Sequence, residues 1–262
     1  MDSNKFSFVS RGVPEYKIKN TLNETGKSVD IYKMTRPKIV AVDGPAGSGK
    51  SSICATVCKD LGWSYVNTGA LYRAIGLLAV DRGVSLIEGP EIKKILEEFA
   101  ETARWEHEAA RLFVGIEDVT PRLNSVEAGN GASAVAKMPM VREALMPIQR
   151  KLSLSAPRGA MVDGRDIGTV IFPDADLKIF MTASLEQRAA RRLKQLEKTG
   201  ATSDLSHEDI MRAIASRDDQ DSQRDSAPMR RADDAILFDT SDMDVAQAIS
   251  NLKELIRSKG LA

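Results

Sequence analysis

One stretch of eight residues has the spacing G-x-x-x-x-G-K-[ST], which is typical of loops that bind the phosphates of a nucleoside triphosphate. Its residues are Gly44, Pro45, Ala46, Gly47, Ser48, Gly49, Lys50 and Ser51. Glycines let the backbone fold tightly enough for several N–H groups to point at phosphate oxygens. We expect Lys50 to reach the β- and γ-phosphates and the Ser51 hydroxyl to bind Mg²⁺, and we count the following Ser52 with the same ATP-binding stretch.

The sequence around this loop fits the strand, loop and helix order that the motif requires. Residues 38–43 (KIVAVD) form a short apolar run, which is typical of a buried parallel strand. Residues 51–58 (SSICATVC) carry apolar side chains at helical spacing, and Gly62 is a stop signal. This context favours a phosphate-binding loop over an ordinary glycine-rich turn, but it does not indicate what is done with the nucleotide.

The composition predicts an ample core and no strong charge. The 262 residues include 37 basic and 37 acidic side chains, so we expect no nucleic-acid surface. No run of about 18 apolar residues occurs, so no membrane span is predicted. Cys54 and Cys58 are expected to be buried thiols of a reducing cytoplasm rather than a disulfide or metal pair. His107 and His207 make no metal-ligand spacing with them.

Residues 1–36 are polar, show no sustained period and contain no apolar core of the kind that a signal peptide needs. We interpret them as a polar N-terminal extension, a tail or a poorly ordered arm. Met34 lies four residues before the first predicted strand. A start at this methionine is a hypothesis, which N-terminal sequencing of the native protein would test.

After the loop, short apolar strands alternate with amphipathic helices. Strands are predicted at residues 63–66, 160–162, 177–181 and 235–238, and helices at about 68–80, 91–102, 184–200, 206–224 and 245–258. Such alternation predicts an α/β fold with a doubly wound parallel sheet, whose ligands bind at the carboxyl ends of the strands.

Residues 84–131 interrupt this alternation and predict a small α+β insertion. Residues 111–116 alternate like a strand, and Glu117 with Asp118 is predicted to form the turn of a hairpin. Asn124 and Glu127 have the spacing of a helix cap. Beyond the insertion, we expect Pro139 to open a helix and Pro147 to kink it.

Several charged or polar residues fall where such a fold places ligands. They are Thr68 and Arg73 after one strand, Asp163, Arg165 and Asp166 after another, and Arg217, Asp221 and Arg224 on one helix face. Arg188, Arg191 and Arg192 form a further set on the preceding helix. Taken singly, each is compatible with a solvated surface charge. Together with a phosphate loop they predict guanidinium groups converging on phosphates, which suits phosphoryl transfer because that reaction depends on positioning and electrostatics.

Five ordered blocks resemble the bacterial-type cytidylate kinases, which belong to the nucleoside monophosphate kinases. The blocks are residues 43–51 (DGPAGSGKS), residues 68–73 (TGALYR), Ser133 with residues 141–145 (VREAL), residues 163–173 (DGRDIGTVIFP), and Arg217, Asp218 and Asp219 with Asp221 and Arg224. The resemblance implies a P-loop kinase domain at 37–262, with a monophosphate-binding insertion at about 84–131 and a helical lid at about 186–226. It also implies a monomeric cytoplasmic enzyme that transfers phosphate from ATP, with Mg²⁺, to CMP or dCMP.

The resemblance also implies roles for particular residues. Recognition of cytosine is assigned to Ser133, Arg142 and Asp166, the acceptor phosphate to Thr68, Arg73, Arg165 and Arg224, the ribose to Asp221, the phosphoryl group in transfer to Arg217, and Mg²⁺ waters to Asp163. Lys50, Arg165 and Arg217 are the implied catalytic residues. A carboxylate such as Asp166 can accept from the exocyclic amine of cytosine, whereas the carbonyl of uracil at that place would repel it.

The sequence departs from the family at Asn67, where its members usually have Asp, and in its residues 1–36. Two other functions stay open. A kinase for another small acceptor, such as a different monophosphate, would share the loop and the arginines. A nucleotide-dependent switch is the second alternative, although the N-K-x-D guanine motif of GTPase switches does not occur.

Overall fold

The structure is a computed structural model that describes residues 21–22, 28–29, 36–198 and 206–262. The chain divides into two units, Met1–Arg36 and Pro37–Ala262. In the first unit, β1 (Thr21–Leu22) pairs with β2 (Ser28–Val29) in antiparallel fashion. The predictions of a poorly ordered arm in the rest of that unit, of a start at Met34 and of a helix end at Gly200 lie outside the described residues.

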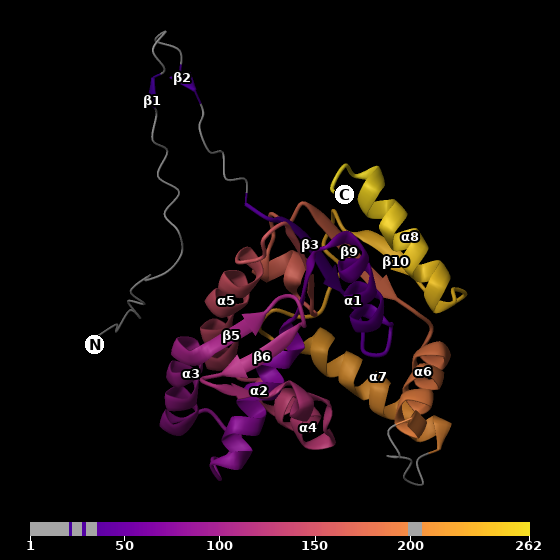
Figure 1. Cartoon of the computed structure of the whole chain (residues 1–262). Coiled ribbons are helices and arrows are strands. Elements are labelled where there is room, and N and C mark those ends of the chain that lie inside the picture. Colours follow the sequence, from indigo (N-terminus) through magenta and orange to yellow (C-terminus); the bar gives the residue numbers. More distant parts are fainter. Residues whose placement is uncertain (1–20, 23–27, 30–35, 199–205) are drawn as a thin grey trace. The chain divides into compact units, whose positions relative to one another are not determined.

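A five-stranded parallel sheet forms the centre of the second unit (Figure 1). Its order is β10 (Ile236–Asp239), β9 (Leu177–Thr182), β3 (Lys38–Asp43), β8 (Gly159–Asp163) and β4 (Ser64–Asn67). Each neighbouring pair runs parallel. The predicted α/β fold with a doubly wound sheet is therefore confirmed.

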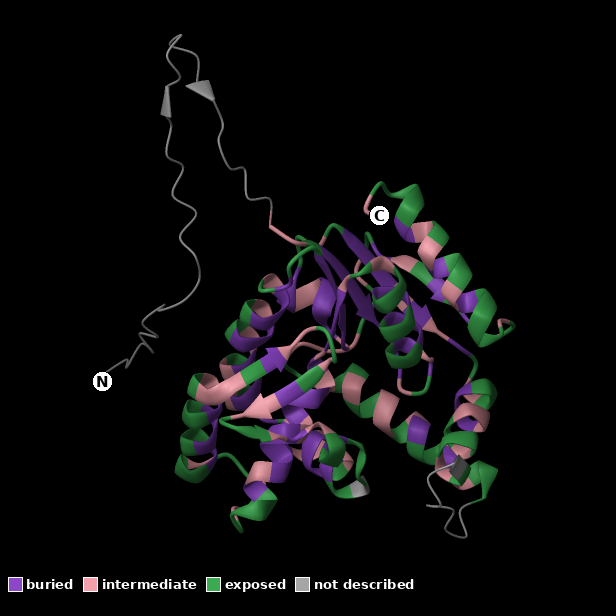
Figure 2. Cartoon of the chain, in the orientation of Figure 1, coloured by how far each residue is buried: buried purple, intermediate pink, exposed green. Residues whose placement is uncertain are grey.

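Helices cover both faces of this sheet, because each strand of a parallel sheet must bury both of its faces (Figure 2). On one face, Val40 and Val42 pack in a core with residues of α1 (Lys50–Leu61) and α8 (Val245–Ser258). On the other face, Ile39 and Ala41 pack with residues of α2 (Thr68–Asp81) and α5 (Pro139–Leu154). Strand β3 is thus buried on both faces, and the phosphate loop begins at the sheet edge where this central strand ends.

Three antiparallel strands and three helical segments form the region between α2 and α5. They are α3 (Pro90–Thr102), β5 (Ala103–Glu106), β6 (Arg111–Val114), β7 (Glu117–Asp118), a 3₁₀ segment (Thr120–Asn124) and α4 (Val126–Val135). The prediction that Glu117 and Asp118 form the hairpin turn is wrong, because they are paired with Val114 and Phe113.

The turn of this hairpin lies at Gly115, whose φ of 61° favours glycine. The predicted helix cap is also displaced by one residue. Ser125, not Asn124, is the N-cap of α4, because its hydroxyl accepts from the N–H of Ala128 at 3.0 Å. Strand β5 was not predicted, since its four residues show little apolar alternation.

Two helices and one short turn carry most of the remaining site residues. Helix α6 (Leu185–Lys198) packs against α7 (His207–Gln223), which begins with a reciprocal capping box of Ser206 and Asp209. A π-helical turn (Ile167–Ile171) follows β8. Helix α5 continues through Pro147, so this proline does not end it.

Candidate active site

The phosphate loop joins β3 to α1, in the predicted order. Gly44, Gly47 and Gly49 have φ values of 143°, 77° and 92°, which residues other than glycine rarely adopt. A Cβ at Gly44 would lie 2.0 Å from the carbonyl oxygen of Met181. The loop therefore requires glycine both for its backbone angles and for its approach to β9.

Lys50 is buried inside the loop. Its Nζ donates to the carbonyl oxygens of Gly44 at 2.7 Å and Pro45 at 2.8 Å, and to Ser48 Oγ at 3.3 Å. Burial, followed by the positive charge of Arg165, lowers the pKa of Lys50 to about 7. An anion bound here would favour the charged form, because opposite charges raise the pKa of an amine.

Two arginines of α6 hold the loop from outside. Arg188 donates to the carbonyl of Ala46 at 3.1 Å and forms an ion pair with Asp218 of α7, which in turn accepts from the N–H of Ala46 at 3.1 Å. Arg191 donates to the carbonyl of Ser48 at 3.1 Å and to that of Thr240 at 2.6 Å. Both guanidinium groups are thus committed to the backbone of the loop and its surroundings.

The third arginine of this set is placed differently. Arg192 donates to Gln195 of its own helix at 2.8 Å. Burial and then the positive charge of Arg192 lower the pKa of Arg73. Arg192 therefore differs from Arg188 and Arg191, whose guanidinium groups bond to the loop backbone.

Asp163, at the end of β8, accepts hydrogen bonds from three hydroxyl groups. Its Oδ2 accepts from Ser51 Oγ at 2.8 Å and from Tyr65 Oη at 2.9 Å. Its backbone carbonyl accepts from Thr68 Oγ1 at 2.8 Å. A hydroxyl and a carboxylate side by side offer hard oxygen ligands, which Mg²⁺ prefers.

No group of three or more His, Cys, Asp or Glu side chains that could hold a metal occurs among the described residues. This donor set still fits Mg²⁺, because that ion usually takes only one or two carboxylates and fills its other positions with water and phosphate oxygens.

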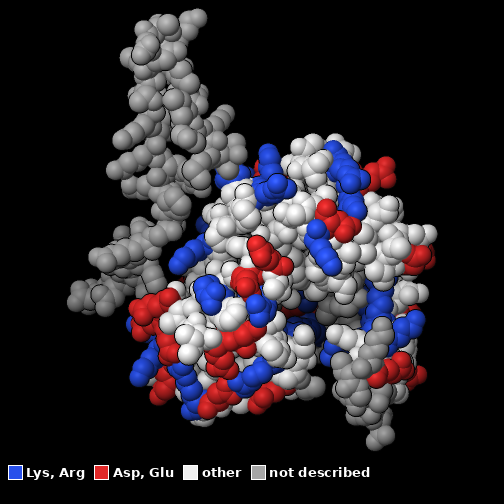
Figure 3. Space-filling view, viewed as in Figure 1, with Lys and Arg blue, Asp and Glu red and all other residues white. Residues whose placement is uncertain are grey.

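Guanidinium groups gather beside the loop at the carboxyl ends of the strands. Arg165 donates to Asp221 Oδ2 at 3.0 Å, and Arg73 donates to the carbonyl of Leu123 at 2.5 Å. Burial, then the charge of Arg165, lowers the pKa of Arg217. In Figure 3, blue Lys and Arg atoms lie set back in the hollow between the α4 side and the α6–α7 side. Such like charges hold together at a cost, which an anion between them would remove.

Arg142 and Asp166 form a buried ion pair next to this group. Arg142 Nη2 donates to Asp166 Oδ2 at 2.5 Å, and the two side chains are only 7% and 9% exposed. The Arg142 guanidinium also lies over the ring of Tyr72, 5.6 Å from its centre. Arg224 Nη2 approaches Asp166 Oδ1 to 3.7 Å.

Two buried donors of this group have no hydrogen-bond partner within the described part of the chain. They are Arg142 Nε and Arg224 Nη2. Buried donors without partners are rare and call for an explanation, which a ligand with acceptor atoms would supply. A hollow of about 40 Å³, lined by residues that include Tyr72, Arg142 and Asp166, lies at this place.

The structure brings most of the predicted site residues to one edge of the sheet, but three are placed less tightly. The Ser133 hydroxyl donates to the carbonyl of Gly129 within α4 at 3.1 Å rather than to the ion pair. Ser52 is exposed on α1. The hydroxyl proton of Thr68 is committed to the backbone of Asp163, which leaves its oxygen as an acceptor.

Three residues at this edge were given no role by sequence reasoning, although Asp43 and Asp218 lie in blocks that carry the family resemblance. Tyr65 and Asp218 contact the loop region as described, and Asp43 accepts two backbone N–H groups of the turn after Asp166. Asp43 carried a signal, because a carboxylate closes an otherwise apolar strand directly before the loop. Tyr65 reads as an ordinary strand residue, so its contact could be found only from the fold.

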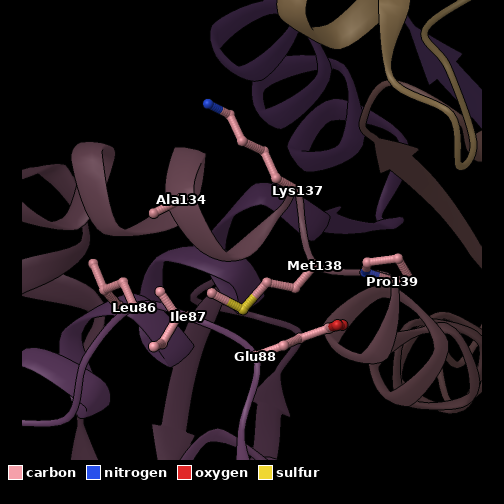
Figure 4. A pocket seen from close by; sticks show the side chains of 7 residues that line it. All are labelled: Leu86, Ile87, Glu88, Ala134, Lys137, Met138 and Pro139. Carbon is pink, nitrogen blue, oxygen red and sulfur yellow. The ribbon is translucent and has the colours of Figure 1, made fainter.

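A larger hollow of about 440 Å³ lies elsewhere, next to the start of α5 (Figure 4). It is lined by Leu86, Ile87, Glu88, Ala134, Lys137, Met138 and Pro139. These side chains are mainly apolar and include a single cation, which does not suit a triphosphate. The candidate active site is therefore the edge that carries the loop and the arginines.

Comparison with known proteins agrees with this placement. The model of the family described as cytidylate kinase matches residues 40–258. The chain belongs to the cytidylate kinase family. It is 43% identical over 222 residues to the cytidylate kinase of Exiguobacterium sp., covering 84% of this chain and 97% of that protein. With the cytidylate kinase of Azotobacter vinelandii it is 40% identical over 230 residues, covering 87% and 98%.

The chain is also 39% identical over 221 residues to the cytidylate kinase of Thermotoga maritima, covering 84% of this chain and 97% of that protein. A solved structure of shikimate kinase from Acinetobacter baumannii in complex with shikimate is similar at 13% identity and a TM-score of 0.43, covering 87% of this chain and 97% of that one. Membership of the cytidylate kinase family identifies this chain as a kinase. Separately, no helix in the described ranges is long and apolar enough to cross a membrane.

Proposed function

We propose that this kinase transfers the γ-phosphoryl group of ATP to the phosphate of CMP and of dCMP. The observation that carries the proposal is the arrangement at one sheet edge. There the phosphate loop, the guanidinium groups and the buried Arg142–Asp166 pair meet. The names of the relatives, all cytidylate kinases, support the same acceptor.

On the donor side, residues 44–52 would bind the phosphates of ATP through backbone N–H groups, which Pro45 alone of them lacks, with Lys50 as the charged partner. Ser51 and Asp163 would hold Mg²⁺, directly and through water respectively, since they already share a hydrogen bond. When bound, the ion neutralises negative charge on the phosphates. Arg192 is the α6 arginine best placed to contact the transferred group, because Arg188 and Arg191 hold the loop itself.

On the acceptor side, Arg73, Arg165 and Arg224 would bind the monophosphate, and the backbone N–H of Thr68 would add a donor to that site. An oxygen of this phosphate attacks the γ-phosphorus while the bond from that phosphorus to the ADP oxygen breaks. Arg217 would neutralise charge that develops on the transferred group. The enzyme would contribute position and charge, and the reaction has little need of a strong base.

The base would be read by the buried ion pair. Asp166 would accept from the exocyclic amine of cytosine, and Arg142 and Ser133 would donate to the ring nitrogen and the carbonyl. Asp221 would accept from ribose hydroxyls. The present hollow of about 40 Å³ has room for only a few water molecules, so a base enters when the surrounding elements move apart. We assign that movement to the insertion at 84–131 and the lid at 186–226 of a monomer in the cytoplasm.

The acceptor itself tests the proposal. We expect kcat/KM for CMP and dCMP to exceed that for UMP and AMP by about 10²-fold or more, because the wrong base leaves Asp166 unpaired. ADP formation, measured with and without each acceptor, gives the rates. A preference for UMP or AMP would overturn the cytosine assignment. ADP release that ignores every acceptor would instead favour a nucleotide switch.

A further inference from the structure

Asp43 is a buried carboxylate that the proposed reaction does not use. It is the last residue of β3, directly before Gly44 of the phosphate loop, and is only 4% exposed. Its Oδ1 accepts from the backbone N–H of Ile167 and its Oδ2 from that of Gly168, both at 2.7 Å. One side chain therefore joins the strand of the donor loop to a segment 124 residues away.

The two N–H groups belong to the start of the π-helical turn after Asp166. Later N–H groups of this turn bond back within it, from Val170 to the carbonyl of Asp166 at 2.9 Å and from Phe172 to that of Ile167 at 2.6 Å. The first N–H groups of a helical segment have no such partner. Asp43 supplies it from another strand, and so fixes the backbone immediately after Asp166.

The held turn is the one that presents the acceptor-reading side chains. Arg165 and Asp166 directly precede Ile167, and Asp166 pairs with Arg142 and approaches Arg224. A small change in the turn would move the carboxylate that meets the base, while the loop on the other side of Asp43 keeps its own glycine geometry.

We propose that Asp43 is a positioning residue that sets the acceptor-reading turn at a fixed distance from the phosphate loop. The assignment of this turn to the acceptor rests on the proposed function. The bond between the two parts is made by a charged group, and bonds of this kind are stronger than those between neutral groups.

The two hydrogen bonds of this carboxylate are made at the cost of burying its charge. Burial raises the pKa of Asp43 to about 6, against the lowering effect of the two N–H bonds and of Lys50, while the charge of Asp166 raises it further. The ionised form is thus retained at neutral pH at a cost to stability, which is typical of groups that serve a site.

Asp43→Asn tests the proposal, because the amide keeps one acceptor and turns an NH₂ group toward the other N–H. We expect KM for CMP to rise roughly tenfold to hundredfold, the range of a lost charged hydrogen bond, with KM for ATP changed less than about threefold. Asp176→Asn is the matched control. Asp176 also accepts a backbone N–H of β3, from Ile39 at 2.8 Å, but at the opposite end of the strand. We expect both KM values of that variant to stay within about twofold.

A second readout needs no substrate. Hydrogen exchange of the Ile167 and Gly168 amides should quicken in Asp43→Asn and stay unchanged in Asp176→Asn. The hydrogen-exchange result remains informative even if the acceptor screen overturns the proposed function, because it measures the turn itself. If Asp43→Asn does not fold, Asp43→Glu keeps the charge at a longer reach and should show the same split between the two KM values.

Equal losses for CMP and ATP in the folded variant would overturn the proposal, because they would place Asp43 with the phosphate loop alone. An unchanged KM for CMP, or unchanged exchange at the two amides, would overturn it as well.

Discussion

The donor and acceptor sides of the active site are built in opposite ways. The donor side is one continuous loop of residues 44–51, in which three glycines take positive φ angles and Lys50 bonds to oxygens of the loop itself. The acceptor side takes Arg73 from α2, Arg142 from α5 and Arg217 from α7. The first is fixed by local backbone chemistry, and the second exists only when the whole unit has folded.

The two sides also differ in how their charges are balanced without a ligand. Lys50 has three oxygen partners, whereas burial and then the positive charges of neighbouring arginines lower the pKa of Arg73 and of Arg217. The loop already supplies hydrogen-bond acceptors for its own lysine before ATP binds. The arginines repel one another, and a bound anion would reduce that repulsion. We therefore expect changes on the donor side to act through the loop's shape and changes on the acceptor side to act through charge.

The largest expected effect is at Arg217, which lies on the acceptor side but is assigned to the group in transfer. Arg217→Ala should lower kcat by about 10³–10⁵-fold with small changes in KM for either substrate, because the charge is needed mainly in the transition state. Steady-state kinetics with CMP and ATP varied in turn measure this. Arg212→Ala, on the same helix with a side chain 74% exposed, should stay within about twofold.

A rise in KM for CMP with little loss of kcat would move Arg217 from the transferred group to acceptor binding. In that case the catalytic charge would have to come from Lys50, Arg165 or Arg192.

The contrast between the two sides also explains what the sequence predicts well. A continuous motif with a strand before it and a helix after it can be read from residue types, as at residues 38–62, because its geometry depends on neighbours in sequence. The parallel sheet follows from the alternation of apolar strands and amphipathic helices. Both predictions are confirmed by the structure.

Contacts between distant segments could not be predicted in this way. Nothing in the residues around Arg142 distinguishes it from a solvated helix charge, and only family resemblance singled it out. The hydroxyl of Tyr65 on Asp163 and the carboxylate of Asp218 on Ala46 depend on strand order and on the packing of α7. The hairpin at Gly115 was misplaced by two residues because Glu117 and Asp118 are common turn residues, although here they pair with β6.

The pH dependence of stability tests whether the buried charge of Asp43, between the donor and acceptor sides, lowers the free energy of unfolding. The pKa of Asp43 is raised in the folded protein to about 6 from 3.8, so the folded state binds more protons at this group between these pH values. Its contribution to stability is then fully present below about pH 4 and is lost as the pH rises through 6. The free energy of unfolding of Asp43→Asn, relative to the unsubstituted protein, should increase by on the order of 2–3 kcal/mol from pH 4 to pH 7.

Urea unfolding at several pH values measures this difference, and the slope with pH is more informative than its absolute value. A difference that stays flat over the range would mean that the two N–H bonds and Lys50 repay the burial of the charge. Folding would then be enough to explain the buried charge of Asp43, without a role on the acceptor side.

The smallest expected effect concerns the scaffold of the acceptor side, where α2 and α4 touch through glycines. A Cβ at Gly76 would lie 2.6 Å from the backbone of Gly131, so Gly76→Ala must push α4 away and should cost about 1–3 kcal/mol of stability. Gly129→Ala on α4 meets no atom within 4 Å and should instead gain roughly 0.5–1 kcal/mol. Because the loop at residues 44–51 is built independently, the Kd for ATP should not change in Gly76→Ala, whereas KM for CMP should rise. A parallel loss of ATP affinity would show that the two sides are not separable, and that the packing of α2 on α4 also supports the phosphate loop.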